Sequence, residues 1–160
     1  MGSIYIQSGI FPMETGYGDQ AYFGMTHRDA VARLEEHFDH LKRGIHTNQY
    51  IQNYYNLKGP DQIYTGIVIE CDDYYLNTLE KAYIWYGNTN RRNNPEGWNK
   101  SGGGEGAKKH LIPYSFVKDE TIHQGDDLLQ FLKIDGSPEP SGFIGLLDGR
   151  TNEYNGYKIY

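Results

Sequence analysis

Cysteine, long apolar runs and basic charge are all scarce in this sequence. Its 160 residues include one cysteine, Cys71, which excludes a disulfide framework and any metal site built from several cysteines. No apolar run approaches the roughly 18–20 residues that a membrane span needs, and the first residues lack the basic-then-apolar pattern of a signal peptide. These absences predict a soluble protein of the cytoplasm.

Acidic residues outnumber basic residues in this chain. The 15 Lys and Arg residues stand against 21 Asp and Glu residues, a formal net charge of −6. A protein that coats nucleic acid is normally basic, so any function on DNA or RNA must rest on a local site. Hydrophobic residues make up 38% of the chain and aromatic residues 14%, which is enough to bury a core and argues against wholesale disorder.

A glycine-rich run at residues 101–106 is the clearest boundary in the sequence, because it offers few side chains for packing. The boundary predicts a domain at residues 1–105, a linker at 106–112 and a small module at 113–160. This division suits a chain of one domain with an appendage.

The first part combines strand and helix patterns in the order β-β-α-α-β-α. Loose alternation and turn-forming residues predict a hairpin of strands at 3–11 and 21–25. Helical spacing predicts helices over 28–43, 48–57 and 76–86, and a β-branched run predicts a strand at 63–69. The fold class is therefore α+β, with a three-stranded, mainly antiparallel sheet flanked by helices.

The second part is predicted to hold a strand at 114–117, helices at 126–132 and 141–147, and a strand-like tail at 154–160. Two short helices with a glycine-containing turn between them are compatible with a helix-turn-helix-like module.

Three residues of the helical segments have the chemistry and position of site residues. Arg33 and His37 lie four residues apart and share one helix face, where a guanidinium and an imidazole would suit a phosphate. On spacing alone, a solvated face with a partly packed histidine is the commoner explanation. Glu80 lies beside an apolar stripe, so its carboxylate is placed to hold Mg²⁺ at a cleft wall. An ordinary surface charge remains the alternative for Glu80 in isolation.

Several short elements follow one another between residues 9 and 104: Gly9-Ile10-Phe11, Tyr22-Phe23-Gly24, Arg33 with His37, His46, Glu80 and Gly97-Trp98-Asn99. In order and spacing, they resemble the GIY-YIG nuclease superfamily, most closely the catalytic domains of phage and intron-encoded homing endonucleases. Each element of the family pattern has a counterpart. The matching residues are Gly9-Ile10-Phe11 for Gly-Ile-Tyr, Tyr22-Phe23-Gly24 for Tyr-Ile-Gly, Arg33, His37, His46 after the helix end, Glu80, and Gly97-Trp98-Asn99 for the closing element.

The resemblance implies a DNA endonuclease that hydrolyses phosphodiester bonds with one metal ion, Mg²⁺ or Mn²⁺, and that works in the host cytoplasm if a phage encodes it. Glu80 would hold the metal, Tyr22 would act as the base, and Arg33 would neutralise the transition state. His37 would relay a proton or hold Tyr22. Supporting roles are implied for Phe11, Gly24, His46 and Asn99.

Phe11 departs from the family pattern, in which a tyrosine supplies a hydroxyl to the site. We expect this change to remove only a supporting hydrogen bond. If the hydroxyl is essential, the chain is instead a catalytically weakened DNA-binding regulator with the nuclease fold.

DNA is the expected partner. Its phosphate backbone is expected to bind four basic residues that flank the cleft: Arg28, Lys42, Arg43 and Lys100. Residues 113–160 carry 4 basic and 8 acidic residues, a net of −4, so phosphate contacts from this module should be poor. A homodimer or a protein partner bound through this C-terminal module is therefore a further expectation. A protein-interaction module is the remaining alternative for the whole chain.

Overall fold

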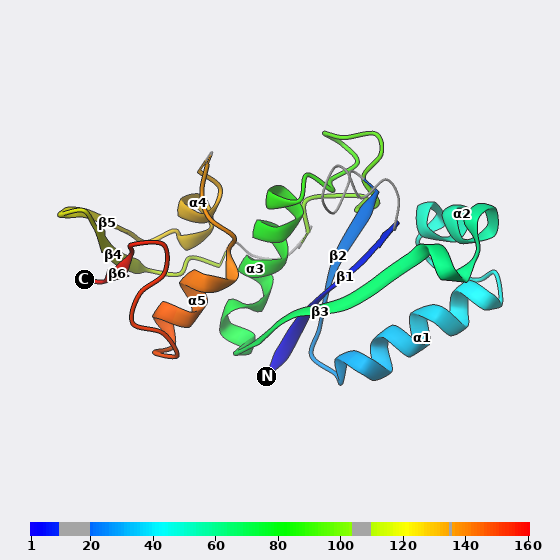
Figure 1. Ribbon diagram of the computed structural model, residues 1–160, viewed down its shortest axis with the longest axis horizontal. Helices are drawn as coiled ribbons and strands as arrows, with labels where there is room; N and C mark the ends of the chain where they lie inside the picture. The colour runs from blue at the N-terminus through cyan, green and yellow to red at the C-terminus, as the bar shows by residue number, and fades with distance from the viewer. Residues whose placement is uncertain (10–19, 104–109, 135) are drawn as a thin grey trace.

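The computed structural model describes residues 1–9, 20–103, 110–134 and 136–160. The first part forms a sheet with helices around it, and a smaller α/β unit follows (Figure 1). The strands are β1 (Gly2–Gly9), β2 (Ala21–Thr26), β3 (Ile63–Cys71), β4 (Tyr114–Lys118), β5 (Thr121–Gly125) and β6 (Lys158–Ile159). The helices are α1 (Ala30–Lys42), α2 (Gln49–Lys58), the short 3-10 helix η2 (Pro60–Gln62), α3 (Asp73–Tyr86), α4 (Leu128–Leu132) and α5 (Ser141–Leu147).

The first sheet has the order β2-β1-β3, and both pairings are antiparallel, as predicted. β1 is the central strand and is almost entirely buried. Because side chains alternate along a strand, Ile4 and Ile6 face one side of the sheet while Tyr5 and Gln7 face the other. The first pair packs with α3 in a hydrophobic core, and the second faces α1.

Polar caps set the helix starts near the predicted positions. The Asp29 side chain accepts a hydrogen bond from the Ala32 N–H at the start of α1, and Asn48 caps α2 in the same way. Gly44 follows α1 with a φ of 69°, a conformation that glycine adopts without strain. Asp72 caps α3, which therefore begins earlier than the predicted residue 76.

The C-terminal part forms a second sheet with the order β5-β4-β6, packed with α4 and α5. The predicted strand at 114–117 and the two short helices are present. β5 was not predicted, and the predicted tail strand is limited to Lys158–Ile159. The helix-turn-helix-like character is not confirmed, because residues 133–140 between the helices exceed the three or four residues of that turn.

Helix α3 lies between the first sheet and the C-terminal part (Figure 1). One hydrophobic cluster joins the three: Ile4 and Ile6 from the sheet, Leu76 and Leu79 from α3, and Phe116 from β4 are all buried in it. Ile112, in the predicted linker, also belongs to this cluster. A second cluster, built on Leu41, Ile51, Tyr54, Ile63 and Trp98, lies under α1 and α2. Among the described residues, no helix has the length and hydrophobicity to cross a membrane.

Candidate active site

A cavity of about 300 Å³ opens where α1, β2, α3 and the loop after Trp98 converge. The four residues predicted to be catalytic, Tyr22, Arg33, His37 and Glu80, all line it. Its full lining in the described residues is Tyr22, Arg33, His37, His46, Thr47, Asn48, Glu80, Asn99, Lys100, Ser101 and Gly103. Residues from positions 22 to 103 of the sequence are thus brought to one place.

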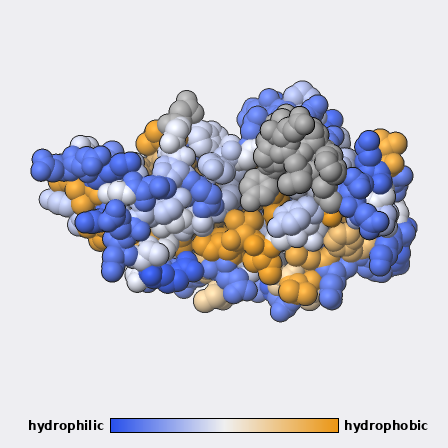
Figure 2. Space-filling view, viewed as in Figure 1, coloured by the Kyte–Doolittle hydropathy of each residue, from blue (hydrophilic) through white to orange (hydrophobic). Residues whose placement is uncertain are grey.

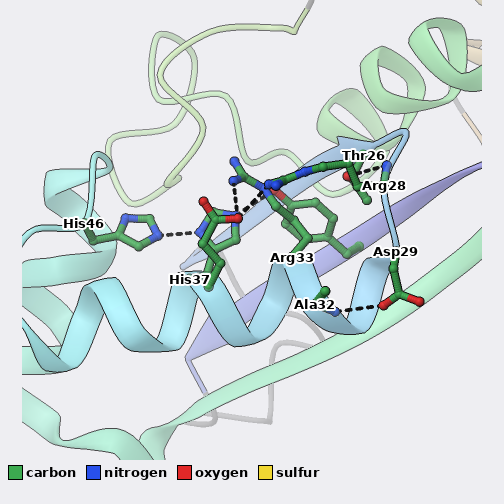
Figure 3. A network of polar contacts seen from close by, with 9 residues as sticks. Thr26, Arg28, Asp29, Ala32, Arg33, His37 and His46 are labelled. Carbon is green, nitrogen blue, oxygen red and sulfur yellow. Dashed lines mark hydrogen bonds and ion pairs between the residues drawn. The ribbon is translucent and has the colours of Figure 1, made fainter.

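Two histidines and a tyrosine form a buried hydrogen-bonded chain at the base of the cavity. The backbone N–H of Asn48 donates to Nδ1 of His46 at 2.9 Å, so a neutral His46 carries its proton on Nε2. The Nε2–H of His46 donates to Nδ1 of His37, and the two nitrogens lie 2.6 Å apart. The proton of His37 is therefore on Nε2, which lies 3.0 Å from the Tyr5 hydroxyl oxygen. Figure 3 shows the two histidine rings directed at each other. One backbone N–H therefore fixes both tautomers.

Both histidines are held neutral. Burial lowers the pKa of His37 to about 4, and the nearby positive charge of Arg33 acts in the same direction. Burial also lowers the pKa of His46. Two neutral rings are what the hydrogen-bonded chain requires, because a second proton on either ring would place two N–H groups face to face.

Tyr5 was not predicted as a site residue. It is almost fully buried on β1, and its ring lies 6.2 Å from the Tyr22 ring. A side chain at Gly24 would place its Cβ about 2.5 Å from the Tyr5 hydroxyl, so Gly24 supports the site by leaving room for Tyr5. The sequence does carry a signal, Ser3-Ile4-Tyr5, in which serine replaces the glycine of Gly-Ile-Tyr.

The expectation of a missing hydroxyl is corrected by Tyr5. The predicted supporting residue Phe11 lies outside the described residues, and so does Ile10 of the motif assigned there. Independently of Phe11, the Tyr5 hydroxyl occupies the site and contacts His37. The site therefore contains two phenol groups, Tyr5 and Tyr22.

Arg33 is held at the cavity edge by a carboxylate on its own helix. Its guanidinium lies 3.2 Å from the Glu36 carboxylate, which also binds Arg28 at 2.6 Å. Arg33 lowers the pKa of Tyr5 and of Tyr22, but burial outweighs it and raises both. For Tyr22 the charges of Tyr5 and Glu80 add to this rise.

Glu80 reaches the cavity from α3. Its pKa is raised, chiefly by burial, against the opposing effects of Lys81 and a hydrogen bond from the Met25 backbone. Gly103, with a φ of 85°, packs against the carboxylate so closely that a Cβ would lie 2.9 Å from Oε1. The loop after Trp98 thus approaches the carboxylate so closely at position 103 that a larger residue there would force the Glu80 side chain to move.

Asn99 joins this loop to β2. Its side chain accepts from the Phe23 N–H at 2.9 Å, donates to the Phe23 carbonyl at 2.8 Å and accepts from Thr89 at 2.7 Å. The predicted supporting residue therefore holds the loop beside the strand that carries Tyr22.

The donor set fits a metal ion held by one carboxylate. Within the described part of the chain, no group of three or more His, Cys, Asp or Glu side chains is placed to share a metal. Three of the four ring nitrogens of His37 and His46 bond within the buried chain, and the fourth bonds to Asn48. Glu80 is the one described carboxylate in the cavity lining, and Mg²⁺ is commonly bound by one or two carboxylates with waters and phosphate oxygens.

The four basic residues predicted to bind substrate are not gathered at the cavity. Lys100 lines it, with Nζ donating to the Thr47 carbonyl at 3.2 Å. Arg28 is paired with Glu36 beside Arg33, and Arg43 lies 3.4 Å from Asp39 on the exposed side of α1. Lys42 lines a different cavity, between α1 and β3.

The first part of the chain has the fold of a GIY-YIG nuclease catalytic domain, as the sequence predicted. Among solved structures it is similar to the catalytic domain of intron endonuclease I-TevI, solved as a glutamate-to-alanine mutant. The two share 22% identity with a TM-score of 0.50, over 66% of this chain and 100% of that one. A second structure of the catalytic domain of homing endonuclease I-TevI matches at 19% identity and a TM-score of 0.48, over 61% of this chain and 96% of that one. No protein-family model and no curated protein matches the sequence.

Proposed function

We propose that the chain is a DNA endonuclease of the phage and homing type that hydrolyses phosphodiester bonds by a one-metal mechanism. The observation that carries this proposal is the cavity, which gathers Tyr22, Arg33 and Glu80 within a fold similar to that of a homing endonuclease catalytic domain. These are a phenol, a guanidinium and a carboxylate, the groups needed for a base, a charge neutraliser and a metal ligand.

Glu80 is the proposed ligand of Mg²⁺ or Mn²⁺. A bound divalent cation stabilises the charge that develops on phosphate and leaving-group oxygens. The partly buried carboxylate, whose pKa burial raises, gains from a neighbouring cation because the cation offsets its desolvation. The Arg33 guanidinium, fixed by Glu36, neutralises the remaining charge of the scissile phosphate.

Tyr22 is the proposed base, because it lines the cavity whereas Tyr5 is buried behind it. Tyr5 acts as a positioning residue. Its oxygen lies 3.0 Å from Nε2 of His37, and its hydrogen bond with Tyr22 lowers the pKa of Tyr5 and raises that of Tyr22. The Tyr22 phenolate is the form able to take a proton from water, and the positive charge of Arg33, which lowers the pKa of Tyr22, favours it.

The test is cleavage of supercoiled plasmid in Mg²⁺, in Mn²⁺ and in EDTA, with Glu80→Ala and the matched surface variant Glu70→Ala. We expect metal-dependent open-circle or linear product from the wild type and from Glu70→Ala, and none from Glu80→Ala. Metal-dependent cutting that survives in Glu80→Ala would overturn the assignment of the metal ligand.

The cleavage assay, together with a gel-shift assay at low salt, separates the alternatives. DNA that is bound at low salt but not cut with either metal would favour a DNA-binding regulator with this fold. The regulator was favoured only because Phe11 was expected to leave the site without a hydroxyl. The Tyr5 hydroxyl, which contacts His37, removes that argument. No retention of DNA at all would favour the protein-interaction module. A homodimer, or a protein partner bound through the C-terminal module, remains a prediction that the comparisons do not support.

A further inference from the structure

A second cavity, of about 260 Å³, lies on the face of the sheet opposite Tyr5 and Tyr22. It is bordered by β3, the second half of α3 and the residues that lead into α5. Figure 2 shows hydrophobic residues gathered near the centre of this view, where the C-terminal part approaches β3. Its lining shares no residue with the candidate active site.

Four of the nine described residues that line this cavity are aromatic. Phe23 and Tyr83 are stacked with their ring centroids 5.3 Å apart and form the buried part. Tyr64 and Tyr86 lie at the rim and are 51% and 43% exposed. Ring faces carry negative partial charge, so a hollow with several of them attracts cations.

One polar atom in this wall has no partner. Tyr83 is 2% exposed, and no residue of the part that the structure describes makes a hydrogen bond with its hydroxyl. A buried hydroxyl without a partner is unfavourable, so the unpartnered Tyr83 oxygen marks a place where a ligand donor would gain a hydrogen bond.

A carboxylate stands beside the rings. Oε2 of Glu139 accepts hydrogen bonds from the Ser141 backbone N–H at 3.2 Å and from the Ser141 hydroxyl. The Tyr154 hydroxyl donates to the Glu139 carbonyl at 2.8 Å and fixes the segment. No ion pair joins Glu139 to a basic residue of the described ranges. Within the described ranges, no hydrogen bond or ion pair engages Oε1, which can therefore accept from a ligand.

We propose that this pocket binds a guanidinium group. A guanidinium is planar, stacks on aromatic faces and donates to a carboxylate and a phenol oxygen at once. A phosphate or other anion would be repelled by Glu139, and a wholly apolar ligand would bury that carboxylate without compensation. The group belongs either to a small free guanidinium compound or to an arginine side chain of a partner protein.

The test uses the full chain and two small probes, ethylguanidinium and its neutral counterpart ethylurea, with the tyrosine ring signals followed by NMR. We expect ethylguanidinium to shift the Tyr83 and Tyr86 signals and ethylurea to leave them unchanged. Equal shifts with both probes, or none with ethylguanidinium, would overturn the proposal.

Variants locate the site. Glu139→Gln keeps an oxygen for Ser141 but loses the charge, and we expect it to weaken ethylguanidinium binding by about tenfold or more. Glu153→Gln, an exposed carboxylate of the same part of the chain, is the matched control and should bind as the wild type does. Tyr83→Phe should weaken binding without lowering stability, because the hydroxyl it removes has no hydrogen-bond partner among the described residues. Unchanged binding in Glu139→Gln would show that the carboxylate is not part of the site.

A further titration separates the two sources of the group. A short blocked peptide with one arginine should bind more tightly than ethylguanidinium if the pocket receives a protein side chain. Equal or weaker binding of the peptide would support a small free guanidinium compound.

Discussion

Replacing Tyr5 by Phe tests the buried hydrogen-bonded chain most directly. The change keeps the ring that packs against Gly24 and removes only the hydroxyl that accepts from Nε2 of His37. The histidine cannot adapt by moving its proton to Nδ1, because His46 already donates there and its tautomer is fixed by Asn48. The variant therefore leaves one buried N–H without an acceptor.

The expected cost is about 1–3 kcal/mol in free energy of unfolding, the usual penalty for a buried donor that loses its partner. With an m value of about 2 kcal/mol per molar, this lowers the urea midpoint by roughly 0.5–1.5 M. Tyr22→Phe is the matched control. It removes a hydroxyl at the cavity surface, where water can take its place, so its cost should stay below about 1 kcal/mol.

Tryptophan fluorescence during urea unfolding measures both variants, and plasmid cleavage measures their activity. We expect Tyr5→Phe to lose stability and part of its activity, and Tyr22→Phe to keep stability and lose cleavage. If Tyr5→Phe is as stable as the wild type, the tautomer assignment is wrong. If Tyr22→Phe cleaves at the normal rate, another group is the base.

Three further results are expected. Folding lowers the pKa of His37 from 6.5 to about 4, so the unfolded chain binds a proton on acidification before the folded chain does. The free energy of unfolding should therefore be highest above pH 6.5 and should fall by up to about 3 kcal/mol between pH 6.5 and pH 4. In a His37→Gln variant, urea unfolding should show no such loss from this position. Gly103→Ala should lower the free energy of unfolding by about 1–2 kcal/mol, because residue 103 has a positive φ. The added methyl group should also displace the Glu80 carboxylate and raise the Mg²⁺ concentration needed for cleavage. An unchanged Mg²⁺ requirement would contradict the contact between Gly103 and Glu80. Phe116→Ala should lower the thermal unfolding midpoint by an amount equivalent to about 3–5 kcal/mol, and a small change would disprove its place in the core.

The first part of the fold could be predicted because its local signals agree. Helical spacing, polar caps and the β-branched run at 63–69 all indicated the elements that are present. β5 was missed because Thr121–Gly125 holds one large aliphatic residue, Ile122, and owes its conformation to pairing with β4. The sheet partner, rather than the local sequence, defines that strand.

The candidate site was predicted where a residue type and a helix spacing coincide, as for Arg33, His37 and Glu80. Tyr5 was missed because Ser3 replaces the expected glycine and because Gly9-Ile10-Phe11 offered a closer match. Lys42 was placed near the cleft from its position on the helix, yet it lines another cavity, since neighbouring residues of a helix point in different directions. The tautomers and the Glu36 contact depend on distances that no sequence pattern contains.

The position of α3 has a consequence for engineering. The helix that carries Glu80 buries Leu76 and Leu79 in a cluster that also contains Phe116 of the C-terminal part. A truncation after residue 105 would expose this apolar surface to water. We therefore expect the first part of the chain to lose stability when it is fused to another protein without the C-terminal part. A transplant that keeps the geometry around Glu80 must carry residues 110–160 or replace the apolar side of the helix with polar side chains.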